Sequence, residues 1–351
     1  SMAAEAIVLE VRSRYGNSVR LISGGSDYHA DAKKGAKSPR LLGECGLTHE
    51  EFFRNPVFRG LVADIGRVLN LKLIAVECRK NVLRMIRAGG HGHVGGALSA
   101  MDIVTALYFD KMNVSPEEAD HPDRDRFLLS AGHKCLAQYA ALAEKGYFAK
   151  EVMDTYGALG SKIPGHPDMH KLPGVEANTG ALGHGLSIAA GMAMAAKLER
   201  RRYKVYAICG DGELPEGSNW EAAAAAAKFG LDNLVVFVDN NGLQISGQVT
   251  EVMNMEPIAG KFAAFGWAVA KIDGNDMEEI VKMLDRLPIE RGKPTLILCH
   301  TVKAKGLSFG ENQAGYHFWN ATEELLRQAE EEMEARAEEL RQEMEAVAYD
   351  G

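Results

Sequence analysis

The sequence predicts an α/β protein with three layers, in which helices cover both faces of a doubly wound, mainly parallel sheet. The main observation is residues 204–247, which follow the order strand, tight acidic turn, helix, strand and tight amide turn. Short apolar runs of strand length alternate with helical segments on both sides of this stretch. An apolar fraction of 46% and 37 glycines fit a globular α/β chain with many strand-to-helix turns.

The two turns in this stretch carry polar oxygens. Residues 204–209 and 234–238 are the predicted strands, and residues 221–229 form the helix between them. A crossover helix brings the ends of two parallel strands to one edge of a sheet, so Asp211 and Asn241 are expected to lie side by side. A carboxylate and an amide carbonyl suit Mg2+ or Ca2+. The neighbouring glycines let the backbone approach a phosphate, and the helix amino end adds N–H donors.

The spacing of these turns resembles a known cofactor motif. GDG at residues 210–212, then 27 residues, then NN at 240–241 is similar to the thiamine-diphosphate-binding motif. The resemblance implies the diphosphate-binding domain of that fold, thiamine diphosphate as cofactor, and a Mg2+ or Ca2+ that bridges its diphosphate. The implied metal ligands are Asp211, Asn241 and the backbone carbonyl of Leu243. The other residues placed at the cofactor are Gly210, Gly212 and, beside its rings, Ile245.

Composition excludes several classes of function. A net charge of −8 argues against nucleic acid and against anionic membrane surfaces as partners. The five cysteines are scattered and form no CxxC pair, which indicates reduced, packed thiols in a cytoplasmic protein. The longest apolar runs have the length of strands, so neither a signal peptide nor a membrane span is predicted.

The first 60 residues differ in kind from the rest. Residues 22–34 resemble the tail of PHP-type metal-dependent phosphoesterases, in which Asp27 and His29 would match a pair of metal ligands. The other His, Asp and Glu ligands of such a site are missing ahead of residue 27. We therefore interpret residues 1–60 as an extension, residues 61–320 as the cofactor-binding domain and residues 321–351 as a charged helix.

A glycine-rich loop follows an amphipathic helix predicted over residues 69–87. The loop contains GHVGG at residues 92–96, which resembles the GHPGG pattern of transketolases, with Val94 in place of the proline. The resemblance implies that His93 contacts the substrate, and His91 is the alternative for that role. Ser99 or Asp102 is expected to begin the next helix.

The next two motifs also resemble transketolase segments. The motif RDRFLLSAGH begins with a predicted strand over residues 124–131 and ends at His133, which would contact the cofactor diphosphate. Cys135 is expected to be a packed helix residue. PGHP at residues 164–167 implies that His166 lies over the reacting carbon. In TGALGHG, the backbone of Gly180 and Leu182 would line the cofactor, and a histidine at 184 replaces the usual glutamine.

The remaining motifs follow the central stretch. Glu216 matches a glutamate that lies at the dimer interface of this family and links two active sites. A strand over residues 262–272, a helix over 276–286 and a strand over 295–300 come next. TVKAKGLSF at 301–309 resembles the split-transketolase pattern, and His317 would contact the diphosphate and assist proton transfer, with Phe318 in place of a glycine. Residues 321–347 form the charged helix.

Together these motifs imply a thiamine-diphosphate-dependent transketolase, which moves a two-carbon ketol unit from a ketose, or ketose phosphate, to an aldose or its phosphate. The implied catalytic residues are His93, His166, His317 and Glu216. Histidines with a pKa near neutral suit the proton transfers. The resemblance ends before the pyrimidine-binding domain that carries the activating glutamate. We therefore expect the amino-terminal subunit of a split enzyme, with a carboxy-terminal partner subunit, in a heterotetramer of two copies of each chain.

Three alternatives stay open from the sequence. The chain could be half of another thiamine enzyme, similar to 1-deoxyxylulose-5-phosphate synthase or to the α-subunit of a 2-oxo-acid dehydrogenase. The motifs GHVGG, RDRFLLSAGH and PGHP favour transketolase. A non-catalytic homologue would account for the substitutions at Val94, His184 and Phe318. A phosphoesterase would use Asp27 and His29 instead.

Overall fold

The computed structural model describes residues 56–349, and Asp27 and His29 lie outside them. Contacts divide the chain into two units. The larger unit runs from Leu71 to Ala337. The smaller unit contains residues 56–70 and 338–349 of the described part, which belong to the long helices α3 (Pro56–Gly89) and α12 (Glu323–Tyr349). The predicted domain boundaries at residues 60 and 320 stay predictions.

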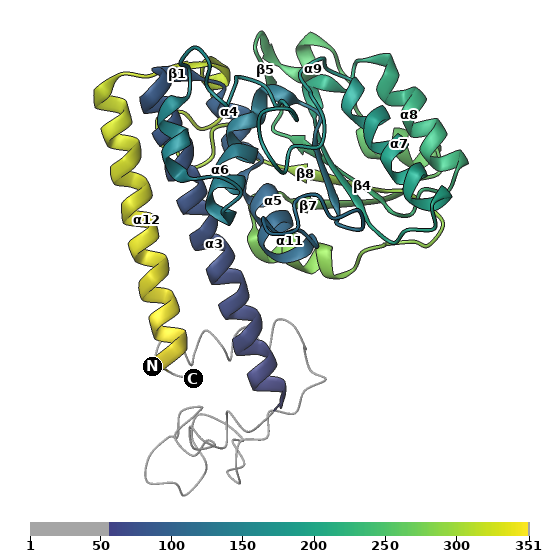
Figure 1. Ribbon diagram of the computed structural model, residues 1–351, viewed down its shortest axis with the longest axis horizontal. Coiled ribbons are helices and arrows are strands. Elements are labelled where there is room, and N and C mark those ends of the chain that lie inside the picture. Colours follow the sequence, from purple (N-terminus) through teal and green to yellow (C-terminus); the bar gives the residue numbers. More distant parts are fainter. Residues whose placement is uncertain (1–55, 350–351) are drawn as a thin grey trace, which may run out of the picture. The chain divides into compact units, whose positions relative to one another are not determined.

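A five-stranded sheet forms the centre of the larger unit (Figure 1). Every neighbouring pair is parallel, and the strands lie in the order β2-β3-β4-β8-β7. The chain passes from β4 to the edge strand β7 and returns to β8, so helices must cross both faces. The predicted parallel α/β sheet is confirmed. The strand bounds are β2 Arg126–Leu129, β3 Val205–Gly210, β4 Leu234–Asn240, β7 Ala268–Asp273 and β8 Thr295–His300.

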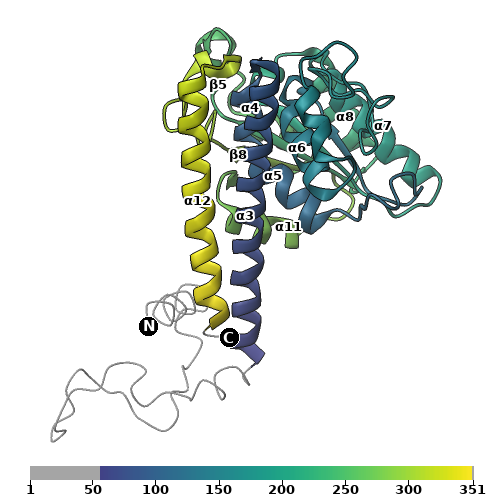
Figure 2. The same cartoon turned by 60° about the vertical axis from the view of Figure 1, so that its left-hand side comes forward.

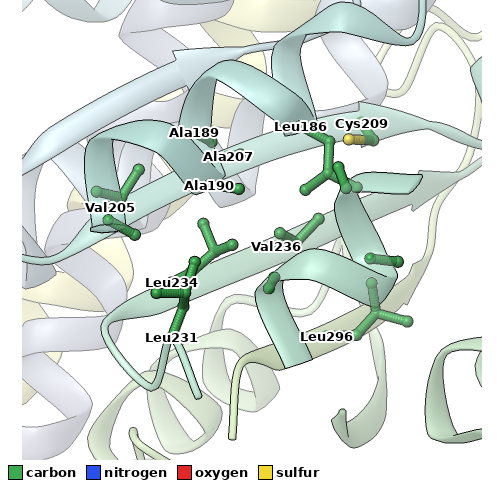
Figure 3. Close-up of a cluster of buried hydrophobic side chains, with 14 of the residues drawn as sticks. Leu186, Ala189, Ala190, Val205, Ala207, Cys209, Leu231, Leu234, Val236 and Leu296 are labelled. Atoms are coloured by element: carbon green, nitrogen blue, oxygen red, sulfur yellow. The ribbon is translucent and has the colours of Figure 1, made fainter. Parts of the chain in front are cut away.

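Helices pack on both faces of this sheet. Figure 1 shows α7 and α8 on one side and α5, α6 and α11 on the other. On the first side, alanines of α7 and α8 are buried with Val205, Leu234 and Val236 of the strands, and Figure 3 shows part of this core. The small side chains let helix and sheet backbones approach closely. The helix bounds are α4 Val94–Ser99, α5 Met101–Ala106, α6 Cys135–Lys145, α7 His184–Leu198, α8 Gly217–Lys228, α9 Val249–Val252, α10 Ile258–Ala264 and α11 Met277–Asp285.

Short elements complete the unit and carry much of the site. The 3-10 turns are η3 (Gly132–Lys134), η4 (Lys150–Thr155), η5 (Asp211–Glu213) and η6 (Ala314–His317), and η2 (Leu107–Lys111) is a π turn. Two antiparallel pairs join β1 (His91–Gly92) to β9 (Trp319–Asn320) and β5 (Leu243–Gln244) to β6 (Gly247–Gln248).

Within the larger unit, the carboxy-terminal part of α3 and the amino-terminal part of α12 lie side by side in both views (Figures 1 and 2). Arg87 forms ion pairs with Glu323 at 2.7 Å and with Glu330 at 2.9 Å, and Lys80 pairs with Glu334 at 2.6 Å. This part of α12 is therefore not free in solvent but covers α3. Among residues 56–349, no helix combines the length and the apolar character that crossing a membrane requires.

One predicted strand is wrong in its first half. Residues 258–264 form helix α10, and the strand begins only at Ala268. Ile258 and Phe262 are four residues apart and both buried, which is the spacing of one helix face. Phe262 packs against Trp267 with ring centroids 5.2 Å apart, across a turn at Gly266 with φ +97°. The aromatic run therefore folds back on itself instead of extending along the sheet.

Candidate active site

The turns after β3 and β4 meet at one edge of the sheet, as the strand–helix–strand pattern predicts. Asp211 begins η5 directly after β3, and its carboxylate accepts the backbone N–H of Gly212 at 2.8 Å. The other carboxylate oxygen accepts the N–H of Gly242 at 2.7 Å, in the turn after β4. Asp211 is buried and thus joins the two turns.

Asn241 and Leu243 supply two further oxygens beside Asp211. The Asn241 side-chain nitrogen donates to Ser99 Oγ at 3.2 Å, and its oxygen accepts the Leu243 N–H at 3.1 Å. The Leu243 carbonyl accepts a hydrogen bond from Lys303 Nζ at 3.0 Å. All three predicted metal ligands therefore lie in the two turns at the same edge of the sheet.

Four histidines from distant parts of the chain form a cluster. The His93 ring centroid lies 5.3 Å from that of His133, 5.5 Å from that of His317 and 6.1 Å from that of His166. The rings of His133 and His317 are 5.1 Å apart. His91 instead stacks on Phe318 at 5.3 Å. The structure thus gathers the four predicted histidines and leaves His91 at the rim.

The charge state of this cluster differs from the sequence-based expectation. Burial, followed by the charge of Lys134, lowers the pKa of His133 to about 2. Burial and then Lys303 lower the pKa of His317 to about 3, and burial with His166 lowers the pKa of His93. The rings of His93, His133 and His317 are therefore neutral at neutral pH, because burial disfavours their charged forms and ammonium groups lie nearby.

This shift predicts how stability depends on pH. His133 has a folded pKa below its unfolded value near 6.5, so the unfolded state takes up its proton first as the pH falls. Below pH 6.5, protonation of His133 in the unfolded state should therefore lower the free energy of unfolding by about 1.4 kcal/mol for each pH unit. Urea unfolding of wild type and His133→Asn between pH 7.5 and 4.5 measures this, and the wild type should lose stability more steeply. Parallel pH curves would show that burial does not control this ring.

Close backbone contacts hold the loops around the histidines. A Cβ atom on Gly132 would lie 2.6 Å from the backbone of Thr179, and one on Gly180 would lie 2.7 Å from the His166 ring. Gly180 also has φ +139°, which residues with a side chain rarely adopt. The predicted cofactor-lining segment with Gly180 and Leu182 therefore lies directly against the turn before His133.

Other predicted residues lie outside this cluster. Ile245 is 73% exposed in the β5–β6 hairpin, and Glu216 is exposed at the start of α8. His184 is exposed, with Nδ1 3.2 Å from the Leu182 carbonyl. Cys135 is buried at the start of α6, and burial raises the pKa of its thiol to about 12, which fits a packing residue. The roles of Ile245 and Glu216 stay predictions.

The sequence interpretation missed two buried lysines at this edge. Lys303 is 2% exposed, and its Nζ lies 3.0 Å from the Leu243 carbonyl and 3.2 Å from His317 Nδ1. Lys134 is 3% exposed and pairs with Asp239. Lys134 follows the RDRFLLSAGH motif and Lys303 lies within TVKAKGLSF, but lysine is usually a surface residue. Only their neighbours along the chain, His133 and the KAKG segment, could have drawn attention to them.

Comparison with known proteins identifies the family. A family model described as the transketolase, thiamine diphosphate binding domain matches residues 72–340, which is well over half of the chain. The chain belongs to the transketolase family. A relative from Phocaeicola vulgatus, named as one of the subunits of an apulose-4-phosphate transketolase, is 44% identical over 277 residues, covering 79% of this chain and 98% of that protein. The 6-deoxy-6-sulfo-D-fructose transketolase subunit SqwG of a Clostridium species is 44% identical over 266 residues, covering 76% and 97%.

Solved structures agree with this assignment. The transketolase of Campylobacter jejuni superposes with a TM-score of 0.70 at 30% identity, covering 80% of this chain and 48% of that one. The chain therefore spans about half the length of that solved transketolase. The predicted fold, family and thiamine-diphosphate-binding domain are confirmed. The chain is one of the subunits of a split transketolase, and hence a transferase.

Proposed function

We propose that this chain anchors thiamine diphosphate through a divalent metal and works with a second chain to transfer a two-carbon ketol unit between sugars or sugar phosphates. The observation that carries the proposal is the juxtaposition of the four-histidine cluster with the Asp211, Asn241 and Leu243 oxygens at one sheet edge. Relatives that match this chain over nearly their full length are named as subunits of transketolases acting on sugar derivatives.

The donor set fits a metal that a diphosphate helps to bind. One carboxylate, one amide oxygen and one carbonyl are hard ligands for Mg2+ or Ca2+, and they leave positions for phosphate oxygens. Among residues 56–349, no group of three or more His, Cys, Asp or Glu is arranged to hold a metal. Burial and the nearby Asp239 raise the pKa of Asp211 to about 6, and a bound cation would relieve that repulsion.

Lys303 supports an anionic ligand at the same place. Burial, followed by the positive charge of Lys134, lowers the pKa of Lys303 to about 8. Within the described part of the chain, its Nζ contacts a carbonyl and an imidazole but no carboxylate. A buried ammonium without an anionic partner is costly. A diphosphate would supply the missing negative charge.

When bound, thiamine diphosphate supplies the carbon nucleophile that adds to the ketose carbonyl. The chain's own task is to hold the diphosphate and to move protons. We assign diphosphate contacts to His133 and His317, and substrate hydroxyl and carbonyl contacts to His93 and His166. A neutral imidazole can accept a proton at its unprotonated ring nitrogen. An anion beside His93, His133 and His317 would raise the depressed pKa of each ring towards the range that proton transfer at neutral pH needs.

The partner would supply what lies outside this domain. We propose a carboxy-terminal transketolase subunit that carries the pyrimidine-binding domain and its activating glutamate, in an assembly of two copies of each chain. The exposed carboxylate of Glu216, at the start of α8, is available for such an interface. Cytoplasmic location stays a prediction.

The test is reconstitution with a carboxy-terminal transketolase subunit as the second chain. The purified chain alone should show no turnover, and the mixture should transfer ketol units to an aldose in the presence of thiamine diphosphate and Mg2+. Decarboxylation of 2-oxo acids, or carboligation that forms a 1-deoxyketose, would instead favour the other thiamine enzymes. Full turnover by the chain alone would contradict the two-subunit proposal. Tight cofactor binding by the mixture without any reaction across a sugar panel would favour a non-catalytic homologue.

A further inference from the structure

Asp239 is a fully buried carboxylate at the end of β4, two residues before Asn241. Its Oδ2 accepts hydrogen bonds from Ser99 Oγ at 2.6 Å and from the Asn241 amide at 3.3 Å. Lys134 Nζ lies 2.5 Å from the same oxygen, and Thr301 Oγ1 donates to Oδ1. One carboxylate therefore joins α4, η3, the turn after β4 and the end of β8.

Lys134 reaches Asp239 past two glycines, which leave room for its side chain because they have no Cβ atom. A Cβ on Gly96 would lie 2.9 Å from Lys134 Cε, and one on Gly210 would lie 3.3 Å from Lys134 Nζ. The ammonium thus lies between the GHVGG loop and the turn that carries Asp211. The side chains of Lys134 and Asp239 are 4% and 0% exposed, so water does not screen the pair.

Stability alone gives a weak reason for this pair. Burying two charges costs desolvation energy that their attraction does not always recover, and apolar replacements are often equally stable. The pair therefore calls for a further role. Its geometry suggests one, because the oxygen that binds Lys134 also binds the amide of Asn241.

The hydrogen bonds of Asn241 select one orientation of its amide. The nitrogen donates to Ser99 Oγ at 3.2 Å and to Asp239 Oδ2 at 3.3 Å. A flipped amide would bring its oxygen against the negative carboxylate of Asp239, which is repulsive. The amide oxygen is therefore held on the side of Leu243, where the other proposed ligand oxygens lie.

We propose that Asp239 and Lys134 are positioning residues for the metal site: Asp239 orients the Asn241 amide so that its oxygen faces the cation, and Lys134 neutralises Asp239 within the buried network. This inference rests on the proposed metal site. Lys134 acts through Asp239 and Asn241 and does not itself ligate the metal. Removing the pair should weaken Mg2+ binding even where the fold stays intact.

Variants of the pair separate positioning from stability. Lys134→Met and Asp239→Asn each leave one buried charge unpaired, so both should lower the thermal midpoint of the unliganded chain. The double variant leaves neither charge and should regain most of that midpoint. Because its residue 239 is a neutral amide that can present either end to Asn241, its Mg2+ affinity should still be at least about 10-fold weaker. Calorimetric Mg2+ titration at saturating thiamine diphosphate measures this.

A second buried pair provides the matched control. Arg79 and Asp102 form an ion pair at 2.8 Å with side chains 7% and 11% exposed, and neither contacts Asn241. Arg79→Met with Asp102→Asn should change stability but leave Mg2+ affinity unchanged. Wild-type Mg2+ affinity in the stable Lys134→Met, Asp239→Asn variant would overturn the inference. An equal loss of affinity in the control pair would overturn it as well.

Two single variants complete the test. Ser99→Ala removes one acceptor of the Asn241 amide with little change in volume, and should weaken Mg2+ binding about 2- to 10-fold. It tests the inference if the double variant does not fold, and wild-type affinity in Ser99→Ala would then contradict it. Asp211→Ala separates a failure of the proposed metal site from a failure of the positioning role. If Asp211→Ala binds Mg2+ normally, the proposed metal site is wrong; if only Asp211→Ala loses Mg2+, the site stands and the positioning role fails.

Discussion

Asp211→Ala is expected to weaken Mg2+-dependent binding of thiamine diphosphate by at least about 100-fold. Asp211 is the one carboxylate in the proposed ligand set, and its two oxygens also join the turns after β3 and β4 through Gly212 and Gly242. The substitution therefore removes a charged ligand and loosens the loop that presents Asn241. Isothermal titration of the cofactor into the chain, with and without excess Mg2+, measures the effect.

The matched control is a carboxylate far from the sheet edge. Asp154 forms a surface ion pair with Arg84 at 2.6 Å, with a side chain that is 53% exposed. Such pairs contribute little, so Asp154→Ala should leave cofactor affinity unchanged. Undiminished Mg2+-dependent binding by Asp211→Ala would refute the metal assignment.

Lys303→Met is expected to weaken thiamine diphosphate binding about 10- to 100-fold, and inorganic pyrophosphate binding to a similar extent. The buried Lys303 ammonium forms no ion pair among the described residues, and its Nζ contacts the Leu243 carbonyl and His317 Nδ1. Methionine keeps the length and apolar stem but cannot offset the charge of a diphosphate. Titration with both ligands separates loss of charge from loss of contacts to the rest of the cofactor.

Lys305 provides the control within the same motif. Its side chain is 39% exposed and pairs with Glu311 at 3.3 Å near the surface. Lys305→Met should therefore bind both ligands as the wild type does. Equal effects of the two substitutions would show that the general positive charge of the segment matters, and would remove Lys303 from the proposed site.

Much of the fold follows from local sequence signals. The apolar runs at 204–209 and 234–238 bounded by GDG and NN predict two parallel strands, and the structure has β3 and β4 there. The predicted strand over residues 262–272 was wrong in its first half because the apolar residues there fit a helix as well as a strand. The length of the segment did not distinguish a helix from a strand. Burial of Phe262 against Trp267 and Trp220 decided for the helix.

The sequence by itself identified the histidines and the turn residues of the proposed site, but not its two buried lysines. His93, His133, His166 and His317 lie in recognisable motifs, and Asp211 and Asn241 end strands whose parallel pairing sends both to one edge. Turn residues and strand ends are local properties, so they can be read along the chain. Only the tertiary structure decided the electrostatics. Ser99 and Asp239 meet across 140 positions, and Lys134 and Asp239 across 105. Burial, which no local pattern specifies for a lysine, makes these charges act on the histidines and on the amide of Asn241.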